Sequence, residues 1–135
     1  MTAMQSFKPL SPTETNALSM LALAHVGDAV FELLVRSMLA AVGPATVQEL
    51  HRKTVSYVRA ESQAKAARKL MPILSEEEST VYRRGRNSHV HGIPAHANPG
   101  DYHSATGLEA LFGWLYLQGK TVLPSVGSRP SYNQR

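Results

Sequence analysis

The stretch from residue 18 to residue 36, LSMLALAHVGDAVFELLVR, constrains the fold more than any other part of the chain. Apolar residues recur in it at three- and four-residue steps, at Leu21, Ala24, Phe31 and Val35. This spacing predicts a helix with one buried face, and Asp28 lies on that same face. Because an unpaired carboxylate is costly to bury, Asp28 needs a cation or hydrogen-bond donors.

A second apolar helix has the same anomaly at Glu109. We expect this helix to be capped by Asp101 and to end near Gly119, and Gly107 and Gly113 within it predict a close helix crossing. Its apolar set comprises Ala105, Leu108, Leu111, Phe112, Leu115 and Tyr116. We hypothesise that the two apolar helices pack at the centre of the fold and that Asp28 and Glu109 meet around a divalent metal.

Two carboxylates suit Mg²⁺, which prefers oxygen ligands and is often held by one or two carboxylates together with substrate phosphates. Such a site is suited to phosphodiester hydrolysis, because the metal activates water and stabilises the leaving oxygen. A structural interpretation of Asp28 remains open. In that interpretation it caps a neighbouring helix or pairs with Arg36.

The rest of the chain also predicts helices. Capping boxes at 11–14, 46–49 and 75–78 mark helix starts, and Gly43-Pro44 ends the central helix near Ala41. Two further helices are expected, one opening at Thr46 and one over 59–70, and the 75–78 box opens another that ends at Arg86. In the helix after Thr46 the predicted buried residues are Val47, Leu50, Val55 and Val58. Residues 87–100, with two prolines and two glycines, predict a loop.

No segment alternates like a strand, so the expected fold is all-α, with five or six helices. We expect one domain over 11–120, a flexible leader over 1–10 and a disordered tail over 121–135. The chain contains no cysteine, no apolar run of transmembrane length and no signal-peptide core near its start. These features favour a cytoplasmic protein without a membrane partner.

Charge distribution favours a nucleic-acid partner over a merely solvated basic face. The net charge is +4, and ten of the fourteen Lys and Arg residues lie between Arg36 and Arg86. The side chains expected to contact RNA phosphates are Arg83, Arg84, Arg86, Asn87, Lys65, Arg68, Lys69, His89 and His96. His89, His91, His96 and His103 lack the spacing of a zinc site, so we interpret them as solvated or phosphate-contacting residues.

Three motifs resemble the ribonuclease III family. LAHVGDAVFE resembles the signature helix of that family, and TGLEALFGWLYL resembles its second acidic helix. RRGRNS between them, the small size and the stretch from Tyr102 to Glu109 are similar to a short branch, which has the catalytic domain without the double-stranded-RNA-binding domain. The resemblance covers about residues 17–119, and three motifs in the right order are strong together.

The resemblance implies a helical homodimer that cleaves double-stranded RNA with Mg²⁺ and leaves 5′-phosphate and 3′-hydroxyl ends. It also implies that Asp28 and Glu109 are the retained metal-binding acids, and that the substrate is the precursor of large-subunit (23S) ribosomal RNA. Ala24 and Thr106 stand where full-length members carry two further acids, losses that the short branch shares. A catalytically silent RNA-binding ribosome-assembly factor and a helical protein-interaction domain remain alternatives.

The loop histidines stand where the short branch commonly has lysines. Because histidine is mostly uncharged at neutral pH, we expect RNA affinity to rise as the pH falls from about 7.5 to 6.

Overall fold

The computed structural model describes residues 8–88, 93 and 95–120, and this part of the chain is all-α, as predicted. Its elements, in chain order, are α1 (Pro12–Asn16), α2 (Met20–Val42), α3 (Val47–Val58), α4 (Ala60–Leu70), the 3₁₀ turn η1 (Met71–Ile73), α5 (Glu76–Arg86) and α6 (Pro99–Leu117). None of these helices is long and apolar enough to cross a membrane.

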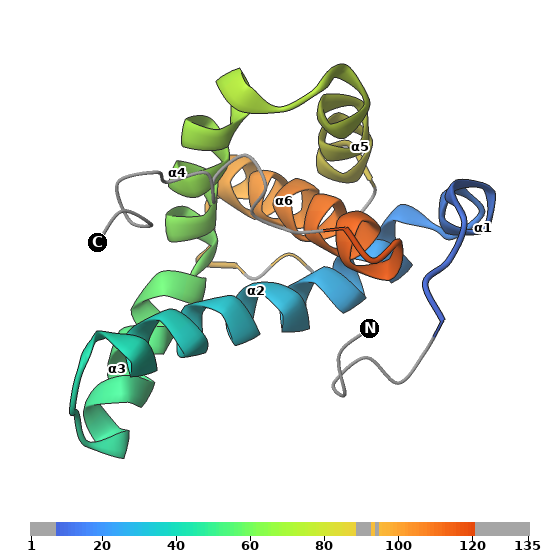
Figure 1. Ribbon diagram of the computed structural model, residues 1–135. Coiled ribbons are helices and arrows are strands. Elements are labelled where there is room, and N and C mark those ends of the chain that lie inside the picture. The colour runs from blue at the N-terminus through green and yellow to red at the C-terminus, as the bar shows by residue number, and fades with distance from the viewer. Residues whose placement is uncertain (1–7, 89–92, 94, 121–135) are drawn as a thin grey trace.

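Helices α2 and α6 cross at the centre of the molecule (Figure 1). Helices α4 and α5 pack on other sides of α6, which makes α6 the most enclosed helix. Helix α3 folds back along the C-terminal half of α2 and projects away from the main body (Figure 1). The molecule therefore has a packed body around α6 and an arm formed by the end of α2 and by α3.

Helix starts follow the predicted capping boxes. The side chains of Ser11, Thr46 and Ser75 each accept a hydrogen bond from the backbone N–H of the glutamate three residues later, and the carboxylate of that glutamate accepts one from the backbone N–H of the cap residue. The predicted start of the last helix was wrong by almost one turn. Asn98 caps α6, Pro99 occupies its first turn, and Asp101 donates its backbone N–H to Asn98 Oδ1 at 3.0 Å.

Helices α2 and α6 approach each other so closely at their crossing that the contact points have no room for a side chain. A Cβ atom on Gly27 would overlap the carbonyl oxygen of Glu109, and one on Gly113 would overlap the carbonyl oxygen of Leu23. Gly107 faces Tyr82 of α5 in a similar way. The predicted close crossings are thus present, and they lie within one chain.

The predicted buried stripe on α2 was partly wrong. Ala24 and Val35 are buried, but Leu21 is 48% exposed, and Phe31 is only partly buried, beside Phe112 at 5.6 Å between ring centroids. Asp28, predicted on the buried face, is also exposed, so its carboxylate is not enclosed by apolar side chains. Because α6 approaches the backbone at Gly27, the buried seam follows Leu23, Gly27 and Val30 instead. Residues 23, 27 and 30 still obey helical spacing, rotated slightly from the expected face.

Helix α3 differs most from expectation. Val47 is 80% exposed and Val55 is 41% exposed, so the prediction that both are buried was wrong. Only Thr54 is buried within this helix, and its hydroxyl donates to the Leu50 carbonyl at 2.8 Å. Since α3 packs mainly against the end of α2, most of its surface meets no other described residue.

The predicted domain limits can be compared with the structure only in part, because much of both predicted end segments lies outside the described residues. Of the predicted leader, residues 8–10 are described, and the backbone N–H of Leu10 donates to the carbonyl of Leu117 at 2.8 Å. The predicted tail over 121–135 and the loop residues His89 and His91 lie outside the described residues.

Candidate active site

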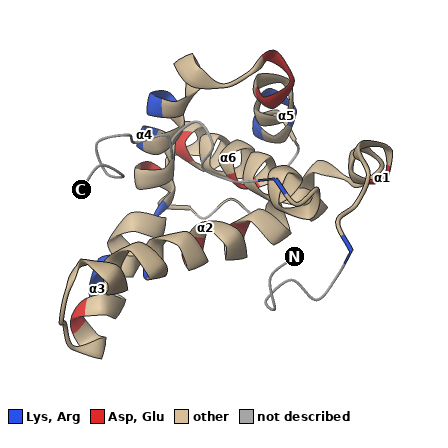
Figure 2. Ribbon diagram, in the orientation of Figure 1, with Lys and Arg blue, Asp and Glu red and all other residues tan. Residues whose placement is uncertain are grey.

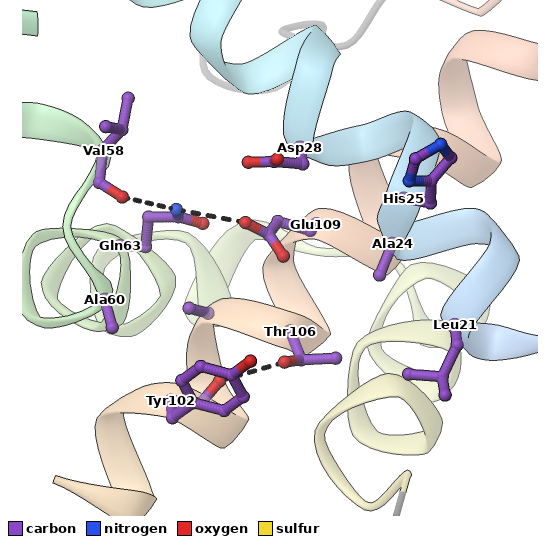
Figure 3. A pocket seen from close by; sticks show the side chains of 11 residues that line it. Leu21, Ala24, His25, Asp28, Val58, Ala60, Gln63, Tyr102, Thr106 and Glu109 are labelled. Carbon is purple, nitrogen blue, oxygen red and sulfur yellow. Dashed lines mark hydrogen bonds between the residues drawn. The ribbon is translucent and has the colours of Figure 1, made fainter. Parts of the chain in front are cut away.

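A pocket of about 360 Å³ opens where α2, α4 and α6 meet (Figure 3). Its lining comprises Leu21, Ala24, His25, Asp28, Val58, Ala60, Gln63, Tyr102, Ala105, Thr106 and Glu109. Apolar and small residues form most of the wall, and the carboxyl groups of Asp28 and Glu109 both project into the space (Figure 3). The structure therefore brings together the two acids that the sequence placed in separate helices.

Glycine 27 explains why these acids meet. Asp28 is the next residue along α2, and the crossing at Gly27 places the α6 backbone at Glu109 directly against it. Any larger side chain at position 27 would push the helices apart and separate the carboxyl groups. In the Gly27-Asp28 pair, the glycine therefore allows the close packing, and this packing positions the carboxyl group of Asp28.

The electrostatics of Glu109 reflect this proximity. Burial and then the neighbouring charge of Asp28 raise the pKa of Glu109 from its ordinary value of 4.5 to about 7, and the hydrogen bond from Gln63 acts in the opposite direction. Near neutral pH the pair can therefore hold a proton. A divalent cation would displace that proton, because a carboxylate must be ionised to bind metal.

The structural alternative for Asp28 fails in one respect. Arg36 pairs with Glu32 one turn away, at 2.7 Å between Arg36 Nη2 and Glu32 Oε2, and both side chains are exposed. Arg36 does not line the pocket. The cation proposed as a partner for Asp28 is thus engaged elsewhere.

Gln63 is the site residue that sequence reasoning missed. Its side chain is buried, and Nε2 donates both to the Val58 carbonyl at 2.9 Å and to Glu109 Oε2 at 3.2 Å (Figure 3). The signal was present in the sequence, because Gln63 interrupts the helical row formed by Ala60, Ala64 and Ala67. A long amide in a row of alanines indicates a specific partner on the facing helix.

The other polar residues of the pocket lie further from the acid pair. His25 is exposed at the edge of the pocket and does not lie between the carboxyl groups (Figure 3). Thr106 donates its hydroxyl to the Tyr102 carbonyl at 3.1 Å. Ala24 and Thr106, the two positions without the expected acids, both line the pocket, which leaves room beside Asp28 and Glu109.

The predicted RNA-binding residues lie outside this pocket. Lys65, Arg68 and Lys69 are exposed on α4, on the side opposite Gln63, and Arg83 and Arg84 are exposed on the last turns of α5 (Figure 2). Their binding role stays a prediction. His96 is also exposed, whereas His89 lies outside the described residues.

Arg86 and Asn87 line a second pocket, at the start of α6. The guanidinium of Arg86 lies over the Tyr82 ring, 5.9 Å from its centroid, and its Nε donates to Asn87 Oδ1 at 3.4 Å. His103 also lines this pocket, and its Nδ1 is buried with no hydrogen-bond partner among residues 8–88, 93 and 95–120. The second pocket is therefore polar and carries the positive charge of Arg86.

The chemistry of the main pocket fits a hard cation with few protein ligands. Asp28 and Glu109 supply carboxylate oxygens, and the buried carbonyl oxygen of Gln63, a lining residue, has no partner in the described part of the chain. Within the described part of the chain, no group of three or more His, Asp or Glu residues could hold a metal. A two-carboxylate site agrees with Mg²⁺, which retains several waters, and disagrees with zinc, which needs three or four protein ligands.

Comparisons with known proteins agree with this geometry. Residues 21–120 match the model of the ribonuclease III domain. A protein of Fusobacterium nucleatum with a known crystal structure has the same fold, with a TM-score of 0.67, 27% identity and coverage of 86% of each chain. The chain therefore belongs to the ribonuclease III family, whose members are endoribonucleases that act on double-stranded RNA.

Its relatives narrow the assignment within that family. The chain is 48% identical over 100 residues to the Mini-ribonuclease 3 of Symbiobacterium thermophilum. The aligned region covers 74% of this chain and 77% of that protein. It is 42% identical over 113 residues to the Mini-ribonuclease 3 of a Synechocystis species, over 84% of this chain and 78% of that protein. The resemblance to the short branch of the family is thereby confirmed.

Proposed function

We propose that this chain is an Mg²⁺-dependent endoribonuclease that cleaves double-stranded RNA at the pocket between α2, α4 and α6. The observation that carries the proposal is the pairing of Asp28 and Glu109 at the α2–α6 crossing, with the pKa of Glu109 raised to about 7. Structural carboxylates are normally paired with cations or capped by backbone donors. A carboxylate pair that raises a pKa this far is typical of a functional site.

Asp28 and Glu109 would hold the cation, and the cation would activate water and stabilise the leaving oxygen of the phosphodiester. The chain's own part is to keep the two carboxyl groups together and to leave space for a phosphate. The small side chains of Ala24 and Thr106 support this role, because a larger residue at either position would narrow the pocket. We propose 5′-phosphate and 3′-hydroxyl products, as the family resemblance implies.

The RNA would lie across the basic faces beside the pocket. A-form duplexes are recognised mainly through their shape and backbone, so exposed cations at several angles suit them. We propose that the phosphates are contacted by the side chains predicted from the sequence, namely Lys65, Arg68 and Lys69 on α4, Arg83, Arg84, Arg86 and Asn87 at the end of α5, and His96. His89 belongs to the same proposal, although it lies outside the described residues.

We propose a homodimer, which would supply paired sites for the two strands. The arm formed by the end of α2 and by α3 supports it, because apolar side chains remain exposed there in the single chain. They include Leu33, Met38, Val42, Val47, Val55 and Tyr57. Several exposed apolar side chains on one small arm favour an interface, and a twofold dimer would use the same residues on both copies.

The biological substrate proposed is the precursor of large-subunit (23S) ribosomal RNA, processed in the cytoplasm. A catalytically silent RNA-binding assembly factor is the second candidate. The specific observation in its favour is that Ala24 and Thr106 line the pocket where full-length members of the family have acids. Both candidates bind duplex RNA, and only the first cleaves it.

Substituting Glu109 separates these candidates. The Glu109→Gln protein should bind duplex RNA with unchanged affinity and cut it at least about a hundredfold more slowly in Mg²⁺. Glu61→Gln, on exposed α4 surface, is the matched control and should cut normally. Wild-type protein that binds duplex RNA in Mg²⁺ without yielding products would favour the assembly factor, and undiminished cleavage by Glu109→Gln would contradict the proposed mechanism.

A further inference from the structure

Gln63 occupies a position that packing alone would give to a small apolar residue. Its side chain is 3% exposed, and its neighbours on the inner face of α4, Ala64 and Ala67, are each 1% exposed. A buried amide is unfavourable unless its polar atoms find partners. The residue therefore has a role that alanine at the same place would not fulfil.

Its amide group joins two elements. Nε2 carries two protons, and it donates to the Val58 carbonyl at 2.9 Å and to Glu109 Oε2 at 3.2 Å. Val58 is the last residue of α3, so its carbonyl is bonded to the side chain at a helix end, where intrahelical donors are lacking. The fixed carbonyl orients the amide, and the oriented amide fixes one oxygen of Glu109 (Figure 3).

The other half of the amide is unsatisfied. Gln63 Oε1 is buried and has no hydrogen-bond partner among the described residues, although the residue lines the pocket. The amide cannot be turned over to relieve this, because both acceptors on the opposite side need the N–H group. This acceptor is closed to water in the structure, so the two hydrogen bonds of the N–H group decide the orientation of the amide at the cost of its oxygen.

We propose that Gln63 is a positioning residue for the metal-binding carboxylate of Glu109, held in its own orientation by the second hydrogen bond of its amide, to the Val58 carbonyl. This inference rests on the proposed Mg²⁺ site at Asp28 and Glu109. It extends that site to a third side chain, from a helix that neither acid belongs to. It also explains how a site with only two acids keeps a defined geometry, because Gln63 restrains one carboxylate without adding charge.

Mn²⁺ binding to RNA-free protein tests the proposal through a readout other than activity. Free Mn²⁺ is measured by electron paramagnetic resonance at pH 8 for wild type, for Gln63→Leu, which keeps the volume and removes the amide, and for a control, Thr54→Val. Thr54 is equally buried, but it bonds within α3 and does not line the pocket. Gln63→Leu should bind Mn²⁺ about 10- to 100-fold more weakly, and Thr54→Val should match wild type.

Cleavage kinetics provide a second discrimination. Gln63→Leu should need about 10- to 100-fold more Mg²⁺ for half-maximal rate, while the KM for duplex RNA at saturating Mg²⁺ stays within about twofold. Equal Mn²⁺ affinity in wild type and Gln63→Leu would overturn the positioning role alone. Wild-type protein that binds no Mn²⁺ would overturn the metal site itself and with it the proposed function.

A measurement on the unaltered protein covers the case in which Gln63→Leu does not fold. The side-chain amide resonances of Gln63 are followed by ¹⁵N-edited NMR during a Mg²⁺ titration, with Gln118 as internal control. Gln118 also donates Nε2 to a carbonyl, that of Trp114 at 2.9 Å, but it does not line the pocket. The Gln63 amide should shift with Mg²⁺ and that of Gln118 should not. Mg²⁺-induced shifts at Glu109 without any at Gln63 would contradict the proposal.

Discussion

The α2–α6 crossing and the arm formed by the end of α2 and by α3 are two differently built regions that share helix α2. At the crossing, Gly27 and Gly113 let the backbones touch, and Leu23, Val30 and Ala110 beside them are buried. In the arm, Val42 and Val47 are each 80% exposed although both are apolar. The first region is closed by packing within the chain, whereas in the second no described residue covers these apolar side chains. The comparison teaches that the candidate site depends on packing inside the chain, and it supports the proposal that the arm depends on assembly.

The largest effect should follow from closing the space at the crossing. Gly27→Ala places a methyl group against the backbone of Glu109, which cannot move aside as a flexible side chain can. We expect a loss near or above the upper end of the usual range for overpacking, about 3 kcal/mol of unfolding free energy, together with loss of cleavage. Val47→Ala in the arm is the contrasting variant and should cost well under 1 kcal/mol in denaturant unfolding of the monomer. Equal costs for the two variants would remove the distinction between the regions.

The contrast between the crossing and the arm also separates what the sequence could predict about the fold and the site from what it could not. Three capping boxes marked helix starts correctly, because a cap is a local arrangement of four residues. The meeting of Asp28 and Glu109 could be expected from two acids in apolar helices. The rotation of the buried seam toward Leu23 could not, because it depends on where α6 crosses. The exposure of Val47 and Val55 was missed, because apolar spacing predicts that a face is covered and does not say whether the same chain covers it.

The pKa of Glu109 gives the crossing a characteristic pH dependence. Its folded-state pKa of about 7 exceeds the ordinary 4.5, so between these values the folded protein holds a proton that the unfolded chain releases. Stability without metal should therefore fall as the pH rises from about 4.5 to 7. At pH 8, Glu109→Gln should stabilise the metal-free protein by up to about 3 kcal/mol in urea unfolding, because it removes the unfavourable charge.

With Mg²⁺ present, wild type should become more stable than Glu109→Gln, the reverse of their order without metal. Wild type gains stability when the cation binds the folded state, and Glu109→Gln gains little. A Glu109→Gln protein that is less stable than wild type without Mg²⁺ at pH 8 would show that the carboxylate has a structural partner.

Assembly should fail when charge is placed in the arm. Val42→Asp combined with Val47→Asp should shift the protein from dimer to monomer at micromolar concentration in sedimentation velocity, since burying two unpaired carboxylates is costly. Because both positions are exposed in the single chain, the helical circular dichroism should persist. The control is Ile73→Asp, an exposed apolar position in η1 outside the arm, which should remain dimeric. A dimer that withstands the arm substitutions and is lost with Ile73→Asp would move the interface elsewhere.

Removing charge from α5 should weaken RNA binding without altering the packing of the α2–α6 crossing or of the arm. Arg83→Ala and Arg84→Ala should each lower duplex affinity and reduce the slope of log affinity against log salt by about 1. Arg52→Ala in α3 is the matched control, exposed but outside the proposed RNA face, and its slope should equal that of wild type. Unchanged slopes for both α5 variants would exclude Arg83 and Arg84 from the interface.

The smallest effect concerns the loop histidines. RNA affinity should rise as the pH falls from about 7.5 to 6, because protonated histidine attracts phosphate. Replacing His89 and His96 by lysine should flatten this rise in fluorescence-anisotropy titrations. An unchanged pH slope in the double variant would assign the dependence to other groups.

The most direct test of the account is the position of a bound cation. Crystals of the wild-type protein grown with Mn²⁺ at pH 8 should give an anomalous difference peak between α2 and α6, coordinated by the carboxylates of both Asp28 and Glu109. A pocket without a peak under conditions that support cleavage, or a peak bound by other residues, would contradict the claim that the α2–α6 crossing builds the catalytic site.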